Sequence, residues 1–247
     1  NNEEGKANGV TKLLDGQHAL ITGASRGIGV AVAIALAEAG ATLSLTARNG
    51  TEIAEVATAL AKKHGVAAAG YAADATNSGQ VEETIRNVTA ARGAPTILVN
   101  NAGVADSAPF LMETHAQWEH TLTLNLTSTF VAMQAVLPAM LNAGYGRIIN
   151  MASTAGLKGY AYVSSYCAAK HGVIGLTRAT ALETARKGVT VNAVCPGYTD
   201  TPMVADAVNK IMKKSGRSRE ETIAELAASN PQRRLLDPPE VAAAVLW

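Results

Sequence analysis

The stretch Leu20-Ile21-Thr22-Gly23-Ala24-Ser25-Arg26-Gly27-Ile28-Gly29 decides the fold of this chain. The apolar run from His18 to Thr22 predicts a strand, and the alanine-rich run from Gly27 to Ala39 predicts a helix. Three glycines at spacing G-x-x-x-G-x-G permit a tight turn between the two and let backbone N–H groups approach a pyrophosphate. Such a turn also serves packing alone, but its place between a first strand and an alanine-rich helix favours dinucleotide binding.

Beyond this turn, apolar strands and alanine-rich helices alternate along the chain. The further predicted strands are Thr42–Thr46, Ala67–Ala72, Ile97–Val99, Arg147–Asn150 and Thr190–Val194. The further predicted helices are Thr51–His64, Gly79–Arg92, Thr127–Leu141 and Ser165–Ala185. This alternation predicts a parallel sheet with helices on both faces, and right-handed crossovers make it a doubly wound α/β domain of the Rossmann type. We expect residues 1–247 to form this single domain.

Three segments depart from the alternation. The more polar stretch Met203–Asn230 predicts two short helices, Val204–Lys214 and Arg219–Ser229, which would form a lid over the substrate. Residues 1–12 are polar and are expected to be a flexible tail. The sequence ends inside a predicted helix, Pro238–Trp247, where a further strand would be expected next, and the absence of this strand is a warning of truncation.

The composition argues against several classes of function. The chain has 247 residues and a formal net charge of +1, so no overall field attracts nucleic acid or an anionic membrane surface. Cys167 and Cys195 lack CxxC spacing and a His or Cys cluster around them, which argues against a metal site or a disulfide and favours the reducing cytoplasm. No apolar run approaches the roughly 18–20 residues that span a bilayer.

The end of the second predicted strand indicates which nicotinamide cofactor binds. An NAD-preferring site places Asp or Glu there, but this strand ends Leu45-Thr46-Ala47-Arg48-Asn49. Arg26 and Arg48 could form a guanidinium fork around a 2′-phosphate, which favours NADP(H) over the alternative of two solvated surface arginines. Asp74, after the third strand, is expected either to accept from the adenine amino group or to cap the next helix.

Three further side chains suggest proton chemistry. Tyr166 and Lys170 stand at i and i+4, on one face of a predicted helix. A nearby ammonium lowers the pKa of a phenol, which lets the tyrosine exchange a proton with an alcohol or alkoxide. Ser153 follows the predicted strand that ends at Asn150, and its hydroxyl could donate to the same substrate oxygen. A Tyr-x-x-x-Lys pair alone usually lies on the protein surface and has no catalytic role.

Taken together, these residues resemble the short-chain dehydrogenase/reductase family over about Leu14 to Trp247. The matching positions are Thr22-Gly23, Gly27-Ile28-Gly29, Asp74, Asn100-Asn101-Ala102-Gly103, Asn125, Ser153, Tyr166, Lys170 and Pro196-Gly197. The resemblance implies a homotetrameric NADP(H)-dependent oxidoreductase that moves a hydride between the nicotinamide and a carbonyl or secondary alcohol. A non-catalytic NADP(H)-sensing protein on the same fold is an alternative, disfavoured because a sensor has no use for all the catalytic groups.

The resemblance also implies individual roles. Tyr166 would be the acid and base, Ser153 would polarise the substrate oxygen, and Lys170 would bind the nicotinamide ribose and lower the tyrosine pKa. Asn125 would hold a water of a proton relay, its alternative being an amide that kinks a helix. The implied cofactor-binding residues are Gly23, Ser25, Arg26, Gly27, Ile28, Gly29, Arg48, Asp74, Asn101, Ala102, Gly103, Tyr166, Lys170, Pro196, Gly197, Thr199 and Thr201.

Two subgroups of the family are similar to this chain, the 3-hydroxybutyrate dehydrogenases and the 3-oxoacyl thioester reductases. The first subgroup binds a small carboxylate through a Gln, a His and a Lys, and this chain has Ala105, Ala155 and Val163 at those places. A CoA or carrier-protein thioester is therefore the favoured substrate, and 3-hydroxybutyrate or another small alcohol the alternative. Basic residues of the predicted lid could meet the phosphates of such a carrier, although a solvated lid face is an equal alternative. These residues are Lys210, Lys213, Lys214, Arg217 and Arg219.

Overall fold

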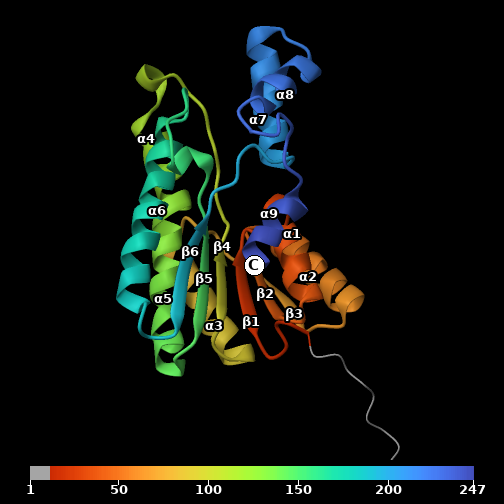
Figure 1. The fold of residues 1–247 in the computed structure, drawn as a ribbon, viewed down its shortest axis with the longest axis vertical. Coiled ribbons are helices and arrows are strands. Elements are labelled where there is room, and N and C mark those ends of the chain that lie inside the picture. Colours follow the sequence, from red (N-terminus) through yellow and green to blue (C-terminus); the bar gives the residue numbers. More distant parts are fainter. Residues whose placement is uncertain (1–11) are drawn as a thin grey trace, which may run out of the picture.

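Parallel strands form one sheet of six in the computed structural model, which describes residues 12–247 (Figure 1). The strands are β1 His18–Thr22, β2 Thr42–Ala47, β3 Ala68–Ala72, β4 Ile97–Asn100, β5 Gly146–Met151 and β6 Val189–Val194. Their order across the sheet is β3-β2-β1-β4-β5-β6, and each neighbouring pair is parallel. This order confirms the predicted doubly wound α/β fold, with all predicted strands in place to within one residue at either end.

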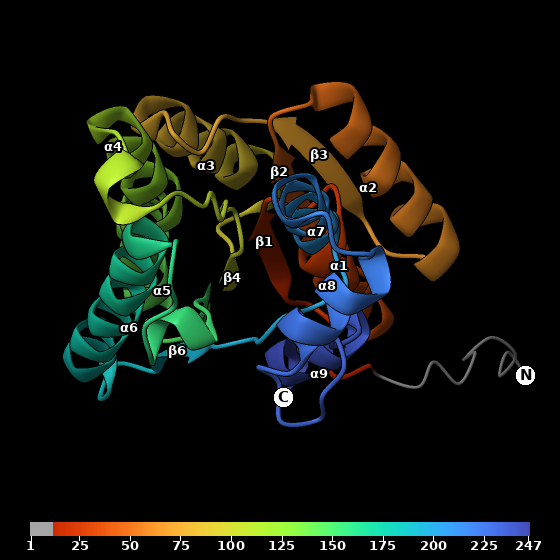
Figure 2. The ribbon, with the colours of Figure 1, turned by 90° about the horizontal axis from the view of Figure 1, so that it is seen from above.

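Helices cover both faces of the sheet because successive residues of a strand point to opposite sides. The helices that pack on the sheet are α1 Gly27–Glu38, α2 Gly50–His64, α3 Ser78–Arg92, α5 Ser128–Ala143, α6 Ser164–Thr184 and α9 Pro238–Leu246. In β1, Ala19 and Ile21 belong to the apolar cluster with α1, α2 and α9. Leu20, between them, belongs to the cluster with α3 and α5, against which α6 also packs. Seen from above, the two groups of helices flank the strands (Figure 2).

The helical segment between β4 and β5 begins earlier than predicted. A 3-10 turn (η1, Phe110–Met112) leads into α4 (His115–Leu122), and a π-helical segment (η2, Thr123–Thr127) joins α4 to α5. The polar sequence of α4 carries little apolar periodicity, and the sequence analysis missed it. Its start is nevertheless marked by a capping box, in which Thr114 and Gln117 each bond the backbone of the other.

The combined segment His115–Ala143 is long and apolar enough to cross a membrane by length and composition, with a mean hydropathy of 1.4. This corrects the expectation that no part of the chain approaches such a span. Val131, Val136 and Met140 of this segment are buried in the cluster between the sheet and α3. Packing on the sheet accounts for the apolar character of this helix.

Two helices, α7 (Pro202–Ser215) and α8 (Arg219–Ala227), belong to the segment expected to form a lid, which is called the lid below; they rise above the carboxyl ends of the strands (Figure 1). They match the predicted pair closely, and in the view from above α7 lies over the β1 and β2 side of the sheet (Figure 2). Of the predicted flexible tail, residues 1–11 lie outside the described residues. Lys12 is described, and its backbone N–H donates to the Asp15 carboxylate over 2.7 Å.

Candidate active site

The glycine turn lies at the switch point of the sheet, where the chain crosses from one side of β1 to the other and continues with β4. Gly23 has a φ of +63°, and a Cβ there would lie 2.9 Å from the Ala102 Cα. A Cβ on Gly29 would collide with the Gly23 carbonyl oxygen. Only glycine therefore lets the turn fold this tightly against the end of β4.

The turn fits a pyrophosphate because no side chain of the turn or of α1 accepts hydrogen bonds from the free N–H groups at the start of this helix. Arg26 is the N-cap residue and makes no side-chain capping hydrogen bond, and the first turn of α1 holds no acid. Its N–H groups and helix dipole thus remain for an anion. Thr201 stands beside this end, since a Cβ on Gly27 would lie 3.3 Å from the Thr201 Cγ2. Its hydroxyl meanwhile accepts from the Val204 N–H and donates to the Thr199 carbonyl, so here it caps α7.

Arg26 and Arg48 are exposed, at the ends of β1 and β2, and neither forms an ion pair within residues 12–247. Asp74 lies near Arg48. Hydrogen bonds from the N–H and hydroxyl of Thr76 lower the pKa of Asp74, and Arg48 adds to this effect. The alternative that Asp74 caps the next helix was wrong, because Asn77 is the N-cap of α3.

The segment after β4 holds the glycine turn in place. Thr22 Oγ1 accepts hydrogen bonds from the backbone N–H groups of Asn101 (3.0 Å) and Ala102 (3.1 Å). Asn101 Nδ2 donates to the Gly23 carbonyl oxygen over 2.9 Å. The side chain of Asn101, expected to bind the cofactor, is thus bonded to the turn itself.

The three proposed proton-transfer residues come together at the carboxyl end of β5. Ser153 follows β5, Tyr166 stands in the first turn of α6, and the Ser153 side chain lies close enough to Tyr166 to hydrogen-bond its phenol and lower the pKa. Lys170 lies one helical turn further on, with its Nζ 5.6 Å from the centroid of the Tyr166 ring. The Lys170 ammonium is buried and donates to the Met151 carbonyl oxygen over 2.7 Å.

Burial shifts the two titratable groups in opposite directions. It raises the pKa of Tyr166 to about 12, although the hydrogen bond from Ser153 acts to lower it. It lowers the pKa of Lys170 to about 8. The lowered tyrosine pKa that we expected from Lys170 is therefore not a property of the protein alone, since loss of hydration raises this pKa instead.

Asn125 is fully buried in the π-helical segment η2. Its Oδ1 accepts from the Val104 N–H (3.2 Å), and its Nδ2 donates to the carbonyl oxygens of Val104 (2.9 Å) and Thr121 (2.9 Å). A Cβ on Gly103 would lie 2.6 Å from Asn125 Oδ1 and 3.7 Å from Lys170 Nζ. Asn125 therefore lies in a widened helical turn, beside Gly103 and near Lys170.

Apolar side chains occupy the three positions at which 3-hydroxybutyrate dehydrogenases bind the substrate carboxylate. Ala155 is buried, with its N–H donating to Ser153 Oγ, and Val163 is the N-cap residue of α6. Ala105 is partly exposed in the segment after β4.

Two tyrosines near the site were missed by the sequence analysis. The rings of Tyr160 and Tyr198 pack edge to face, 6.2 Å apart, and the Tyr160 hydroxyl bonds the Thr154 hydroxyl. Tyr198 lies close enough to Tyr166 to add to the rise of its pKa. Tyr198 could have been predicted from the sequence, because it lies between Gly197 and Thr199, which were both expected to bind the cofactor.

The strand β6 leads into the lid through Pro196 and Gly197. The Pro196 carbonyl oxygen accepts from the Thr154 N–H over 2.9 Å, which brings this connection beside Ser153. Thr199 is buried and forms a parallel bridge with Leu236. The expected cofactor wall formed by Pro196, Gly197 and Thr199 thus lies next to the proton-transfer residues.

The foot of the lid is held by the buried side chain of Asn230. Asn230 bonds both the N–H (3.0 Å) and the carbonyl oxygen (2.8 Å) of Tyr198. Asn230 also donates to the Arg234 carbonyl oxygen over 2.7 Å. The two ends of the lid therefore leave the sheet side by side.

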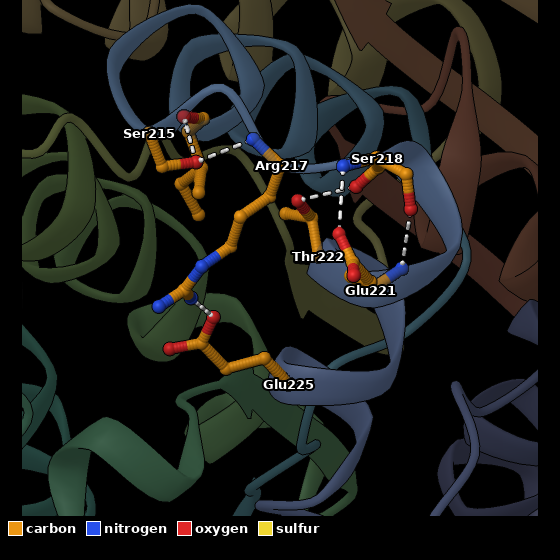
Figure 3. Close-up of polar contacts among 7 residues, drawn as sticks. Ser215, Arg217, Ser218, Glu221, Thr222 and Glu225 are labelled. Carbon is orange, nitrogen blue, oxygen red and sulfur yellow. Dashed lines mark hydrogen bonds and ion pairs between the residues drawn. The ribbon is translucent and has the colours of Figure 1, made fainter.

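The tip of the lid is braced by its own polar side chains (Figure 3). Ser218 and Glu221 form a capping box at the start of α8, and the Arg217 N–H donates to Ser215 Oγ. Arg217 pairs with Glu225 across the tip (Figure 3). The two lid helices are thus joined by a well-bonded connection.

Three of the five basic lid residues already have partners. Lys210 Nζ lies 3.1 Å from Asp106 Oδ1, which links α7 to the segment after β4. Arg217 pairs with Glu225, and Arg219 donates to the side chain of Asn209. Lys213 and Lys214 have no ion pair among the residues that the structure describes.

Comparisons with known proteins agree with this geometry. Residues 17–211 match the model of the family described as short chain dehydrogenase. The chain belongs to the short-chain dehydrogenase family. It is therefore an oxidoreductase that uses a nicotinamide cofactor.

Among curated relatives, the chain is 37% identical to a D-beta-hydroxybutyrate dehydrogenase of Cupriavidus necator, covering 95% of this chain and 91% of that protein. It is 40% identical to the 3-oxoacyl-(acyl-carrier-protein) reductase FabG of Vibrio cholerae, covering 95% and 90%. Among solved structures, a variant actinorhodin polyketide ketoreductase with NADPH superposes with a TM-score of 0.88 at 37% identity, covering 93% of this chain and 88% of that one.

Proposed function

We propose that this short-chain dehydrogenase reduces the ketone of a 3-oxoacyl thioester, carried on CoA or acyl carrier protein, with NADPH. One observation carries the proposal. The Ser153 and Tyr166 side chains lie together beside Lys170, while Ala105, Ala155 and Val163 stand at the three positions where the similar hydroxybutyrate dehydrogenases hold a carboxylate. A free carboxylate there would lose its hydration without a partner, whereas an uncharged acyl chain would not.

The proton chemistry follows from the hydroxyl pair. Both hydroxyls can donate to the oxygen of a bound ketone, which draws electron density away from the carbonyl carbon. The bound nicotinamide supplies the hydride. Tyr166 keeps its proton at neutral pH because burial raises its pKa to about 12, so it is poised to give that proton to the nascent alkoxide. Lys170 places a cationic charge near the phenolate that remains.

The choice of NADP(H) rests on the two exposed arginines. Arg26 and Arg48 flank the glycine turn without ion-pair partners among the described residues, and each presents a planar fork of N–H donors suited to a phosphate. The NADPH-bound ketoreductase among the similar structures supports the same choice.

Reduction of a small keto acid, or oxidation of 3-hydroxybutyrate, is the second candidate function. The Cupriavidus necator relative favours it. The Vibrio cholerae reductase and the polyketide ketoreductase are about as similar and favour the thioester. The apolar side chains of Ala105, Ala155 and Val163 support the thioester.

We further infer that the protein acts in the cytoplasm as a homotetramer. The apolar side chains of Phe130 on α5 and Leu182 on α6 are exposed, with 44% and 82% of their surface accessible. These helices carry alanine-rich faces that suit close approach across a two-fold axis. Cys167 and Cys195 are free thiols, as a reducing compartment would keep them.

The test compares acetoacetyl-CoA with acetoacetate at saturating NADPH. We expect a higher kcat/KM for the thioester. A clear preference for free acetoacetate would refute the thioester assignment. The Tyr166→Phe variant is the control on the chemistry, since it removes the hydroxyl but keeps the ring, and it should lose about 10²–10⁴-fold in turnover.

A further inference from the structure

The N-terminus of α6, which carries Tyr166, is not capped by its own sequence. Its N-cap residue, Val163, offers no side-chain hydrogen bond, and the first turn of the helix contains no acidic residue. A helix end of this kind leaves backbone N–H groups and a partial positive charge without a local partner. Some other part of the chain must satisfy them.

Glu113 reaches this helix end from a distant segment. It directly follows the 3-10 turn η1 and is partly buried. Glu113 Oε2 accepts a hydrogen bond of 2.7 Å from the hydroxyl of Ser164, the first residue of α6 and 51 positions away in sequence.

The neighbouring Ser165 faces the same carboxylate. Its buried hydroxyl makes no hydrogen bond among residues 12–247, but Ser165 lies close enough to Glu113 to lower the pKa of that carboxyl. The polar groups of Ser165 and the hydrogen bond from Ser164 hold the pKa of Glu113 below its usual range, so the carboxylate stays charged. A charged carboxylate at a helix N-terminus is favourable both for its hydrogen bonds and for the helix dipole.

A second contact ties the same two segments together. The Ala108 N–H donates to the Tyr162 carbonyl oxygen over 2.9 Å, just before α6 begins. Tyr162 has a φ of +68°, a left-handed conformation that costs a non-glycine residue of order 1–3 kcal/mol. Such a conformation persists only where its surroundings impose it. Specific hydrogen bonds therefore fix the start of α6 to the segment around η1.

We propose that Glu113 is a positioning residue of this reductase, which caps the first turn of α6 from the η1 segment and fixes Tyr166 against Ser153. Tyr166 stands one residue after Ser165, so a shift of this turn moves its hydroxyl directly. The inference rests on the proposed roles of Tyr166 and Ser153. It does not depend on which ketone is reduced, because Glu113 acts only through α6.

The experiment compares Glu113→Ala, Glu113→Gln and Ser164→Ala with the matched control Glu119→Ala. Glu119 is exposed on α4, close to Glu113 in sequence, and its side chain makes no hydrogen bond or ion pair with the described residues. NADPH oxidation is followed with acetoacetyl-CoA, or with acetoacetate should that prove the better substrate. NADPH affinity is measured separately by its fluorescence.

We expect Glu113→Ala to lower kcat by about tenfold or more, as misplacement of a reacting group does, with NADPH affinity unchanged. Glu113→Gln keeps one acceptor oxygen and should lose less. Ser164→Ala should lose activity too, and the double variant Glu113→Ala with Ser164→Ala should be no worse than Glu113→Ala, because both changes break one interaction. The control should match the unmutated protein.

The pH profile separates positioning from stability. Ser153 acts to lower the pKa of Tyr166, so its displacement in Glu113→Ala should raise that pKa. The rise of 3-hydroxybutyryl-CoA oxidation with pH, which needs the deprotonated tyrosine, should then move to higher pH. A lower melting temperature with unchanged kcat and pH profile at 25 °C would overturn the proposal. Retained activity in Tyr166→Phe would instead refute the proposed mechanism on which it rests.

Discussion

The protonation of Lys170 should control activity between pH 7 and pH 9. Burial lowers the pKa of Lys170 to about 8, so about 90% of the amine is charged at pH 7 and about 10% at pH 9. Tyr166 stays protonated over this range, because burial raises its pKa to about 12. If the ammonium is needed for cofactor binding and proton transfer, kcat/KM for NADPH should fall about tenfold between the two pH values, since kcat/KM reports the free enzyme.

The assay is steady-state NADPH oxidation with acetoacetyl-CoA from pH 6.5 to about pH 10 at constant ionic strength, with circular dichroism at each pH to follow the fold. Lys170→Arg keeps its charge throughout, because a guanidinium titrates above pH 12. In that variant the alkaline limb should vanish from the range, even if the absolute rate is lower. Lys187→Arg, an exposed exchange, should leave the limb in place. A flat profile for the unmutated protein would refute the reasoning, as would a limb that Lys170→Arg does not move.

Two other predictions concern the cofactor and the fold. Replacing Arg48 by Ala should lower kcat/KM with NADPH by roughly ten- to hundredfold and leave that with NADH nearly unchanged, because a charged hydrogen bond contributes about 1.5–3 kcal/mol; equal use of both cofactors by the unmutated protein would contradict this. Burial lowers the pKa of His18 below 6.5 in the folded protein. The unfolded chain then binds a proton first as the pH falls, so the free energy of unfolding should be constant above about pH 6.5 and decrease below it. Urea unfolding at pH 7.5 and 5.5 checks this, and an equal decrease in His18→Asn would rule His18 out as the cause.

The strands and their winding could be predicted because the signals were local. The glycine turn, the apolar strands and the glycines that end helices, such as Gly65 after α2, each lie within a few residues of what they determine. The helix α4 was missed for the opposite reason. Its eight residues have little apolar periodicity, and only the short capping signal of Thr114 and Gln117 marked its start.

The site was harder to predict where its contacts cross the chain. Ser153, Tyr166 and Lys170 were found from spacing, since two of them share one helix turn. The contact of Glu113 with α6 joins residues 51 positions apart, and no local sequence pattern predicts it. The rise of the Tyr166 pKa was equally hidden, because it depends on burial, and burial is a property of the folded protein.

The way the lid joins the sheet has a consequence for how this enzyme can diversify. The segments that lead into and out of the lid lie side by side, since Thr199 pairs with Leu236 and Asn230 hydrogen-bonds Tyr198. Its tip is braced by its own side chains. Because the two ends of the lid are fixed to each other, we expect its sequence and length to be able to change while Ser153, Tyr166 and Lys170 keep their positions. We expect changes within the lid to alter which ketone is accepted while the residues for proton transfer stay in place.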